Sequence, residues 1–172
     1  MLGNGKRFED IADSFYASLR QEVIEGNPHL NEMEQIKLRR YYPVMVNHKC
    51  YPPDLVAMVY SSRRCHAVRV ILESKDPVVL DAGCAFGSES FLFASLGAKV
   101  FAIDNCGERI AIAEKRKSYY EELFERPLNI KFILSNLEEY VPEAKNISLT
   151  WLASVLAAIR DQRGLLQKMT AS

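Results

Sequence analysis

The chain has 172 residues and no net charge, because 22 lysines and arginines are balanced by 22 aspartates and glutamates. This length and the 48% hydrophobic fraction are typical of one compact domain with a sizeable core. Without an overall positive field the chain is a poor ligand for nucleic acid, and no nucleic acid partner is expected. No segment has the pattern of a membrane span or a signal peptide, so we predict a cytoplasmic protein without a membrane partner.

Helical patterns dominate the first part of the chain. Apolar residues recur every three or four positions over residues 7–25, which predicts an amphipathic helix. Further helices are expected in this part, among them two separate ones, from Pro53 onward and over residues 64–74. We therefore predict a helical extension over residues 1–75 that precedes a core over residues 76–172, within one compact domain.

A strand, a glycine turn, a helix and a second strand are predicted over residues 78–104. The first apolar run carries Asp81 and leads to Gly83 and Gly87, and the second apolar run ends on Asp104. In such a unit the glycines let backbone amides approach a nucleotide, and the acidic side chain after the second strand accepts hydrogen bonds from two ribose hydroxyls. The pattern predicts a site for an adenosine-containing cofactor.

The glycine spacing separates two classes of cofactor. A dinucleotide fingerprint needs Gly-x-Gly-x-x-Gly at the start of the helix, whereas here Gly83 and Gly87 stand four positions apart with Ala85 between them. An NAD-type enzyme is therefore the disfavoured alternative. An acidic residue on the first strand followed by Gly-x-x-x-Gly resembles the first motif of the class I S-adenosylmethionine-dependent methyltransferases.

The resemblance extends over about residues 78–166 and implies a cofactor site. It places the loop after the first strand around the methionine part of S-adenosylmethionine, and Asp104 at the ribose with Asn105 beside the adenine. At the tip of the third strand the family commonly has an aspartate that binds the adenine amino group, and Asn136 can still accept that hydrogen bond through its side-chain oxygen. The implied cofactor-binding residues are Asp81, Gly83, Cys84, Ala85, Gly87, Asp104, Asn105, Asn136 and Leu137.

The resemblance also implies an α/β fold, with a three-layer Rossmann-like, partly parallel sheet and an N-terminal helical extension. Alternating strands and helices with short connections independently favour a parallel sheet covered on both faces. Helices are expected over residues 88–96 and 108–124, the second with Tyr120 directed inward and Arg116 outward. In the family topology the strands lie in the order third, second, first, fourth.

The last part of the sequence departs from the family pattern. After the fourth strand, over residues 147–152, a helix is expected from about Ala153, and the sequence stops at Ser172 before a fifth strand. The sheet is therefore expected to be incomplete on its C-terminal side, with an open edge at the fourth strand. A naturally shortened chain, an expressed fragment and a homodimer that covers the edge would each account for this pattern.

The resemblance implies transfer of a methyl group from S-adenosylmethionine to an unidentified small-molecule acceptor, with S-adenosylhomocysteine as the product. The acceptor would attack the sulfonium methyl in line with the departing sulfur, so the protein would supply mainly proximity and alignment. No catalytic residue is assigned, because the segment after the fourth strand offers no evident base. The alternative is a cofactor-binding module, or a truncated methyltransferase, without catalysis.

Several residues of the N-terminal extension are open to two interpretations. By the resemblance the extension forms a lid, which makes Tyr41, Tyr42, His48 and Tyr51 candidates for the lining of a pocket; alternatively they pack the extension onto the sheet. His48 or His66 could act as a general base near neutral pH. The cysteines and histidines match no familiar metal-binding spacing, so no metal is predicted and reduced thiols are expected.

Overall fold

The computed structural model describes residues 8–46 and 52–170 of the chain. The chain divides into two compact units, Met1–Val70 and Ile71–Ser172. The division between residues 75 and 76 expected from the sequence stays a prediction. Within the described ranges, no helix combines the length and the apolar character that crossing a membrane requires.

The first unit is helical. Arg39 connects two of its helices, because its guanidinium donates to the backbone oxygens of Val23 at 3.1 Å and Ile24 at 3.2 Å, near the end of the first helix. Asn31 and Glu34 form a capping box that starts the second helix. The helices are α1 (Phe8–Glu25), α2 (Glu32–Tyr41), α3 (Pro43–Val46) and α4 (Pro53–Glu73), of which the last three residues belong to the second unit.

One helix replaces the two that were expected in the second half of the extension. The separate helices predicted from Pro53 and over residues 64–74 are wrong, because α4 runs without a break. After Pro53 this segment contains neither glycine nor proline, so nothing in its backbone interrupts the helical hydrogen bonds.

The second unit contains a four-stranded parallel sheet in the order β3-β2-β1-β4, which confirms the predicted strand order. Because the strands are parallel, their carboxyl ends meet at one edge of the sheet. Asp81 pairs in register with Ala102, so the tips of the two central strands lie side by side. The strands are β1 (Val78–Ala82), β2 (Lys99–Asp104), β3 (Ile130–Leu134) and β4 (Leu149–Trp151).

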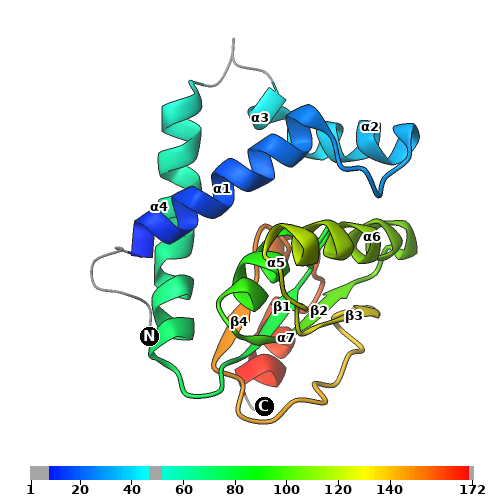
Figure 1. The fold of residues 1–172 in the computed structure, drawn as a ribbon. Coiled ribbons are helices and arrows are strands. Elements are labelled where there is room, and N and C mark those ends of the chain that lie inside the picture. Colours follow the sequence, from blue (N-terminus) through cyan, green and yellow to red (C-terminus); the bar gives the residue numbers. More distant parts are fainter. Residues whose placement is uncertain (1–7, 47–51, 171–172) are drawn as a thin grey trace. The chain divides into compact units, whose positions relative to one another are not determined.

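Helices cover both faces of this sheet (Figure 1). On one face α5 (Ser88–Ser95) contacts β1, β2 and β3, and α6 (Gly107–Leu123) contacts β2 and β3. The alternate strand residues point to the opposite face, where α7 (Gln162–Thr170) completes an apolar cluster. The expected three-layer α/β fold is therefore confirmed.

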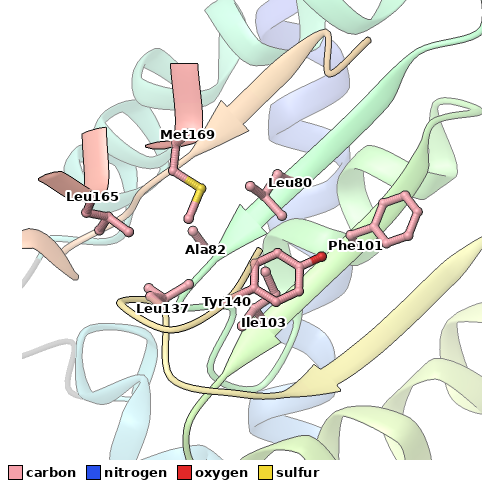
Figure 2. Packing of buried hydrophobic residues seen from close by; sticks show 8 residues of the cluster. All are labelled: Leu80, Ala82, Phe101, Ile103, Leu137, Tyr140, Leu165 and Met169. Carbon is pink, nitrogen blue, oxygen red and sulfur yellow. The ribbon is translucent and has the colours of Figure 1, made fainter. Parts of the chain in front are cut away.

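The apolar cluster on the α7 face holds the third layer in place. Figure 2 shows Met169 of α7 pointing toward Ala82 of β1, with Leu137 and Tyr140 beside Ile103 of β2. The cluster thus joins α7, the segment after β3 and the two central strands. Its buried members are Leu80, Ala82, Phe101, Ile103, Leu137, Tyr140, Leu165 and Met169.

The helix expected from about Ala153 is wrong. The structure has a short 3-10 turn, η1 (Leu156–Ala158), and α7 begins only at Gln162. Asp161 starts α7, because its side chain accepts a hydrogen bond from the backbone N–H of Gly164 at 2.8 Å, as an N-cap residue does. Between β4 and Asp161, Val155 packs against the apolar cluster and not along a helix face.

Lys168 fastens α7 to the segment after β3. Its ammonium donates to the backbone oxygens of Glu138 at 2.7 Å and Tyr140 at 2.9 Å. We expect Lys168→Met to lower the free energy of unfolding by about 1–2 kcal/mol, because two partly buried carbonyls lose a charged donor. Urea denaturation measures the change.

The exposed lysine at position 145 provides the matched control. Lys145→Met should change the free energy of unfolding by less than about 0.5 kcal/mol. Equal urea midpoints for the two variants would show that the Lys168 bonds do not stabilise the unit.

Candidate functional site

The glycine loop, residues 83–87, connects β1 to α5 in an unusual backbone conformation. Gly83, Ala85 and Gly87 have φ values of 85°, 48° and 79°, so every second residue is left-handed. A left-handed alanine costs roughly 1–2 kcal/mol, which glycine avoids. The loop therefore needs strong anchors to keep its shape.

Backbone hydrogen bonds attach the loop to the neighbouring strand. The N–H groups of Gly83 and Cys84 both donate to the backbone oxygen of Ile103 at 2.8 Å, and the N–H of Gly87 donates to the oxygen of Cys84 at 2.8 Å. The start of the loop is thus fixed to the end of β2, and its last residue closes a turn.

Asp104, at the tip of β2, anchors the middle of the loop. One carboxylate oxygen accepts the N–H of Ala85 at 2.9 Å, and the other accepts the N–H of Cys106 at 2.9 Å. Its side chain is 5% exposed, and Arg109 lies 3.7 Å away from the second oxygen. Because each carboxylate oxygen has two lone pairs, both oxygens keep capacity for a ligand hydroxyl.

Asp81 lies on β1, just before the glycine loop begins. Its carboxylate is buried and accepts a hydrogen bond from the hydroxyl of Ser90 at 2.5 Å. Since Ser90 lies in the first turn of α5, the bond connects β1 to the beginning of the helix that follows the loop. The structure therefore places Asp81 beneath α5.

Cys84 is a buried thiol in a negative environment. Burial raises its pKa far above the ordinary range, and the charges of Asp81, Asp104 and Glu89 raise it further. The thiol therefore stays protonated at neutral pH and is no nucleophile. The same three carboxylates make the loop a favourable place for a positive charge.

The tip of β3 reaches the same edge of the sheet. The backbone N–H of Ser135 donates to the backbone oxygen of Asp104 at 3.0 Å, and this bond joins the two strand ends. Asn136 is exposed, and its side-chain oxygen accepts the N–H of Glu138 at 3.0 Å. Leu137 belongs to the apolar cluster on the α7 face. The cofactor roles of Asn136 and Leu137 stay predictions, as does that of exposed Asn105.

Of the candidates in the first unit, Tyr41 ends α2, Tyr42 follows that helix, and His66 lies on α4. Tyr41 is 46% exposed and its ring contacts that of Tyr42 edge to face at 4.9 Å. His66 is exposed and its ring nitrogen lies 3.2 Å from Arg69. His48 and Tyr51 lie outside the described residues. In the part of the chain that the structure describes, no group of three or more His, Cys, Asp or Glu side chains could hold a metal.

Residues 73–171, more than half of the chain, match the model of a family described as a methyltransferase domain. The chain belongs to this methyltransferase family. A solved structure, magnesium protoporphyrin IX methyltransferase (ChlM) from Synechocystis PCC 6803 with bound S-adenosylmethionine, matches with a TM-score of 0.54. The two chains are 15% identical, over 98% of this chain and 73% of that one, so this likeness concerns the fold. A search of curated proteins found no match. The family predicted from the sequence is confirmed, and with it the class of cofactor.

One residue beside the glycine loop was predicted wrongly. Arg116 of α6 was expected to point outward, yet it is fully buried. Its guanidinium donates to the backbone oxygen of Phe86 and to the hydroxyl of Ser88 at 3.0 Å, on either side of the loop's last glycine. The signal was its spacing of four from Tyr120, which places both side chains on one face of the helix.

The absence of a side chain at Gly83 lets Val155 lie close to the glycine loop. A Cβ at this position would lie 2.7 Å from Cγ2 of Val155, and the backbone is left-handed. We expect Gly83→Ala to lower the free energy of unfolding by about 2–4 kcal/mol, because backbone strain adds to the steric clash. Chemical denaturation measures the loss.

Gly97 offers a matched control, because it has a φ of 96° and nothing lies within 4 Å of the position that a Cβ would take there. Gly97→Ala should cost only the backbone strain, about 1–2 kcal/mol. In a Val155→Gly background, which removes the contact, Gly83→Ala should cost no more than Gly97→Ala does. A Gly83→Ala variant as stable as Gly97→Ala would show that the contact with Val155 imposes no constraint.

The state of the Cys84 thiol can be tested by alkylation. Iodoacetamide at pH 8 should modify Cys65 and Cys106, which are partly accessible, and leave Cys84 unmodified. The reason is that the raised pKa of Cys84 keeps it protonated where a free thiol, with a pKa of about 8.5, is partly ionised. Mass spectrometry of the peptides gives the extents, and the protein unfolded in urea is the control. Equal rates at Cys84 and Cys106 in the folded protein would contradict this.

Proposed function

We propose that the chain binds S-adenosylmethionine at the carboxyl ends of β1 and β2 and transfers its methyl group to a small-molecule acceptor. The observation that carries the proposal is the hydrogen bond from the Ala85 N–H to the Asp104 carboxylate. It brings the glycine loop and the acidic strand tip into contact, and these are the two parts that an adenosine cofactor needs together.

The donors and acceptors at this edge suit the ribose of the cofactor. Asp104 is nearly buried, so a hydrogen bond to its charge is stronger than one in water. Each of its oxygens accepts one backbone N–H and retains a lone pair. Two adjacent hydroxyls of a ribose match two adjacent carboxylate oxygens.

The beginning of α5 suits the amino-acid end of the cofactor. The N-cap residue of this helix is Gly87, which provides no side-chain hydrogen bond to the first turn. Backbone N–H groups at a helix start favour a negatively charged group, because they donate hydrogen bonds and lie at the positive end of the helix dipole. The carboxylate of the methionine part is such a group.

The charges around the loop suit the sulfonium centre. Asp81, Asp104 and Glu89 raise the pKa of Cys84, because their charges make the potential at this residue more negative. A negative potential stabilises a positively charged sulfur. The loop therefore favours the methyl donor by charge as well as by shape.

When bound, S-adenosylmethionine supplies a methyl group on a positively charged sulfur. A lone pair of the acceptor forms the new bond to this carbon while the carbon–sulfur bond breaks, its electron pair stays on sulfur, and the acceptor proton passes to solvent. Asp104 and the glycine loop orient the donor and hold it in place, so they contribute chiefly proximity and alignment. The zero net charge of the chain supports a small-molecule acceptor and not a polyanion.

Calorimetric titration tests the cofactor site. Wild-type protein should bind S-adenosylmethionine and S-adenosylhomocysteine at a ratio of one to one. Asp104→Asn should lower the affinity for both compounds by about tenfold or more, because the amide has one accepting oxygen and no charge. Circular dichroism verifies that the variant is folded.

The exposed Glu114 on α6 supplies the control, and Glu114→Gln should leave both affinities unchanged. If the folded wild-type protein binds neither compound, the proposed function is wrong. If Asp104→Asn binds as tightly as the wild type, the ribose assignment is wrong.

A further inference from the structure

We propose that Arg116 is a positioning residue for the cofactor, a role that rests on the function proposed above. It lies on α6, outside the loop and the strand tips, and is fully buried. It therefore cannot be reached from solvent and acts through the groups that it holds. Among these groups are the backbone oxygen of Phe86 and the hydroxyl of Ser88.

Arg116 and Asp104 hold the glycine loop at two adjacent residues. Asp104 accepts the N–H of Ala85, and Arg116 donates to the carbonyl of Phe86, the next residue. Between these bonds the backbone carries the left-handed Ala85, at a φ of 48°. A strained residue persists only where its surroundings fix it, so the two side chains together maintain the shape of the loop.

The position of Arg116 also determines where α5 begins. Phe86 precedes the N-cap Gly87, and Ser88 is the first residue of the helix. By binding groups on both sides of Gly87, Arg116 fixes the direction of the first N–H groups of α5. These N–H groups are the ones that we assign to the amino-acid end of the cofactor.

The guanidinium adds positive charge at a helix end that is already positive. The N-terminus of a helix favours anions, so a cation beside it raises the local affinity for a carboxylate. Arg116 is retained in the core by hydrogen bonds and by aromatic rings, since its central carbon lies 5.2 Å from the ring centre of Phe91 and 5.8 Å from that of Tyr120. An apolar side chain of similar volume would fill the space without the cost of burying a charge.

The role predicts a selective loss of affinity. S-Adenosylhomocysteine and 5′-methylthioadenosine share the adenosine and the thioether sulfur, but only the first has the amino-acid end. Arg116→Met should lower the affinity for S-adenosylhomocysteine by about tenfold or more, and the affinity for methylthioadenosine by less than about threefold. Arg116→Lys, which keeps the charge but not the planar fork, should lie between the wild type and Arg116→Met.

Calorimetry with both compounds, or displacement where affinity is weak, provides the measurement. Lys115→Met is the matched control, because it removes one positive charge from the exposed face of the same helix, and it should change neither affinity. Ser88→Ala removes the hydroxyl that Arg116 binds and leaves its bond to Phe86, so it should produce a smaller loss with the same selectivity. If Arg116→Met does not fold, Arg116→Lys and Ser88→Ala decide the question.

The outcomes separate this proposal from the function on which it rests. Equal weakening of the two compounds, or no weakening of either, would overturn the positioning role while leaving the cofactor site in place. Failure of the folded wild-type protein to bind S-adenosylhomocysteine would overturn both. A loss confined to S-adenosylhomocysteine would support the positioning role, because a general loss of stability does not distinguish between the two ends of a ligand.

Discussion

The hydrogen bond between the Ala85 N–H and the Asp104 carboxylate is the constraint on which the rest of the site depends. It joins the loop after β1 to the tip of β2, and it requires the two strands to be paired in one register. In that register Ala82 lies opposite Ile103, whose carbonyl also accepts two N–H groups of the loop. A slip of one residue would turn Asp104 to the other face of the sheet and leave the loop without its anchor.

The two faces of the sheet differ in the residues that they bury. On the α7 face, Leu80, Ala82 and Ile103 contribute only apolar surface, and this layer provides stability. On the α5 face, Asp81 and Asp104 are buried as well, so they need hydrogen-bond partners from Ser90 and the loop backbone. The polar groups of the site are therefore fixed by the same contacts that make their burial tolerable.

Local pattern was sufficient to predict most of the core. The apolar runs, the two glycines and the acidic strand tip predicted the central strands and the helices on the α5 face, because each of these features is determined by a few neighbouring residues. The strand order followed from the family resemblance. The predictions were wrong where contacts between residues far apart in the sequence determine the structure. Arg116 was assigned to solvent because charged residues are seldom buried, whereas its bonds to the carbonyl of Phe86 and the hydroxyl of Ser88 favour a buried position. The family pattern places a helix directly after the fourth strand. Here the apolar residues after β4 pack on the cluster instead, and the helix begins only at the Asp161 cap.

The chemistry proposed for the site explains why its parts are buried and held by hydrogen bonds. A sulfonium leaving group is already activated, so the rate of methyl transfer depends mainly on how well the donor and the acceptor are aligned. Alignment is lost when the groups that hold the donor can move, and side chains on the surface move more freely than buried ones. Asp104 and Arg116 approach the loop from two different elements, and both are buried. A strained loop held from two sides has one shape available to it, which is the property that a catalyst working by alignment requires.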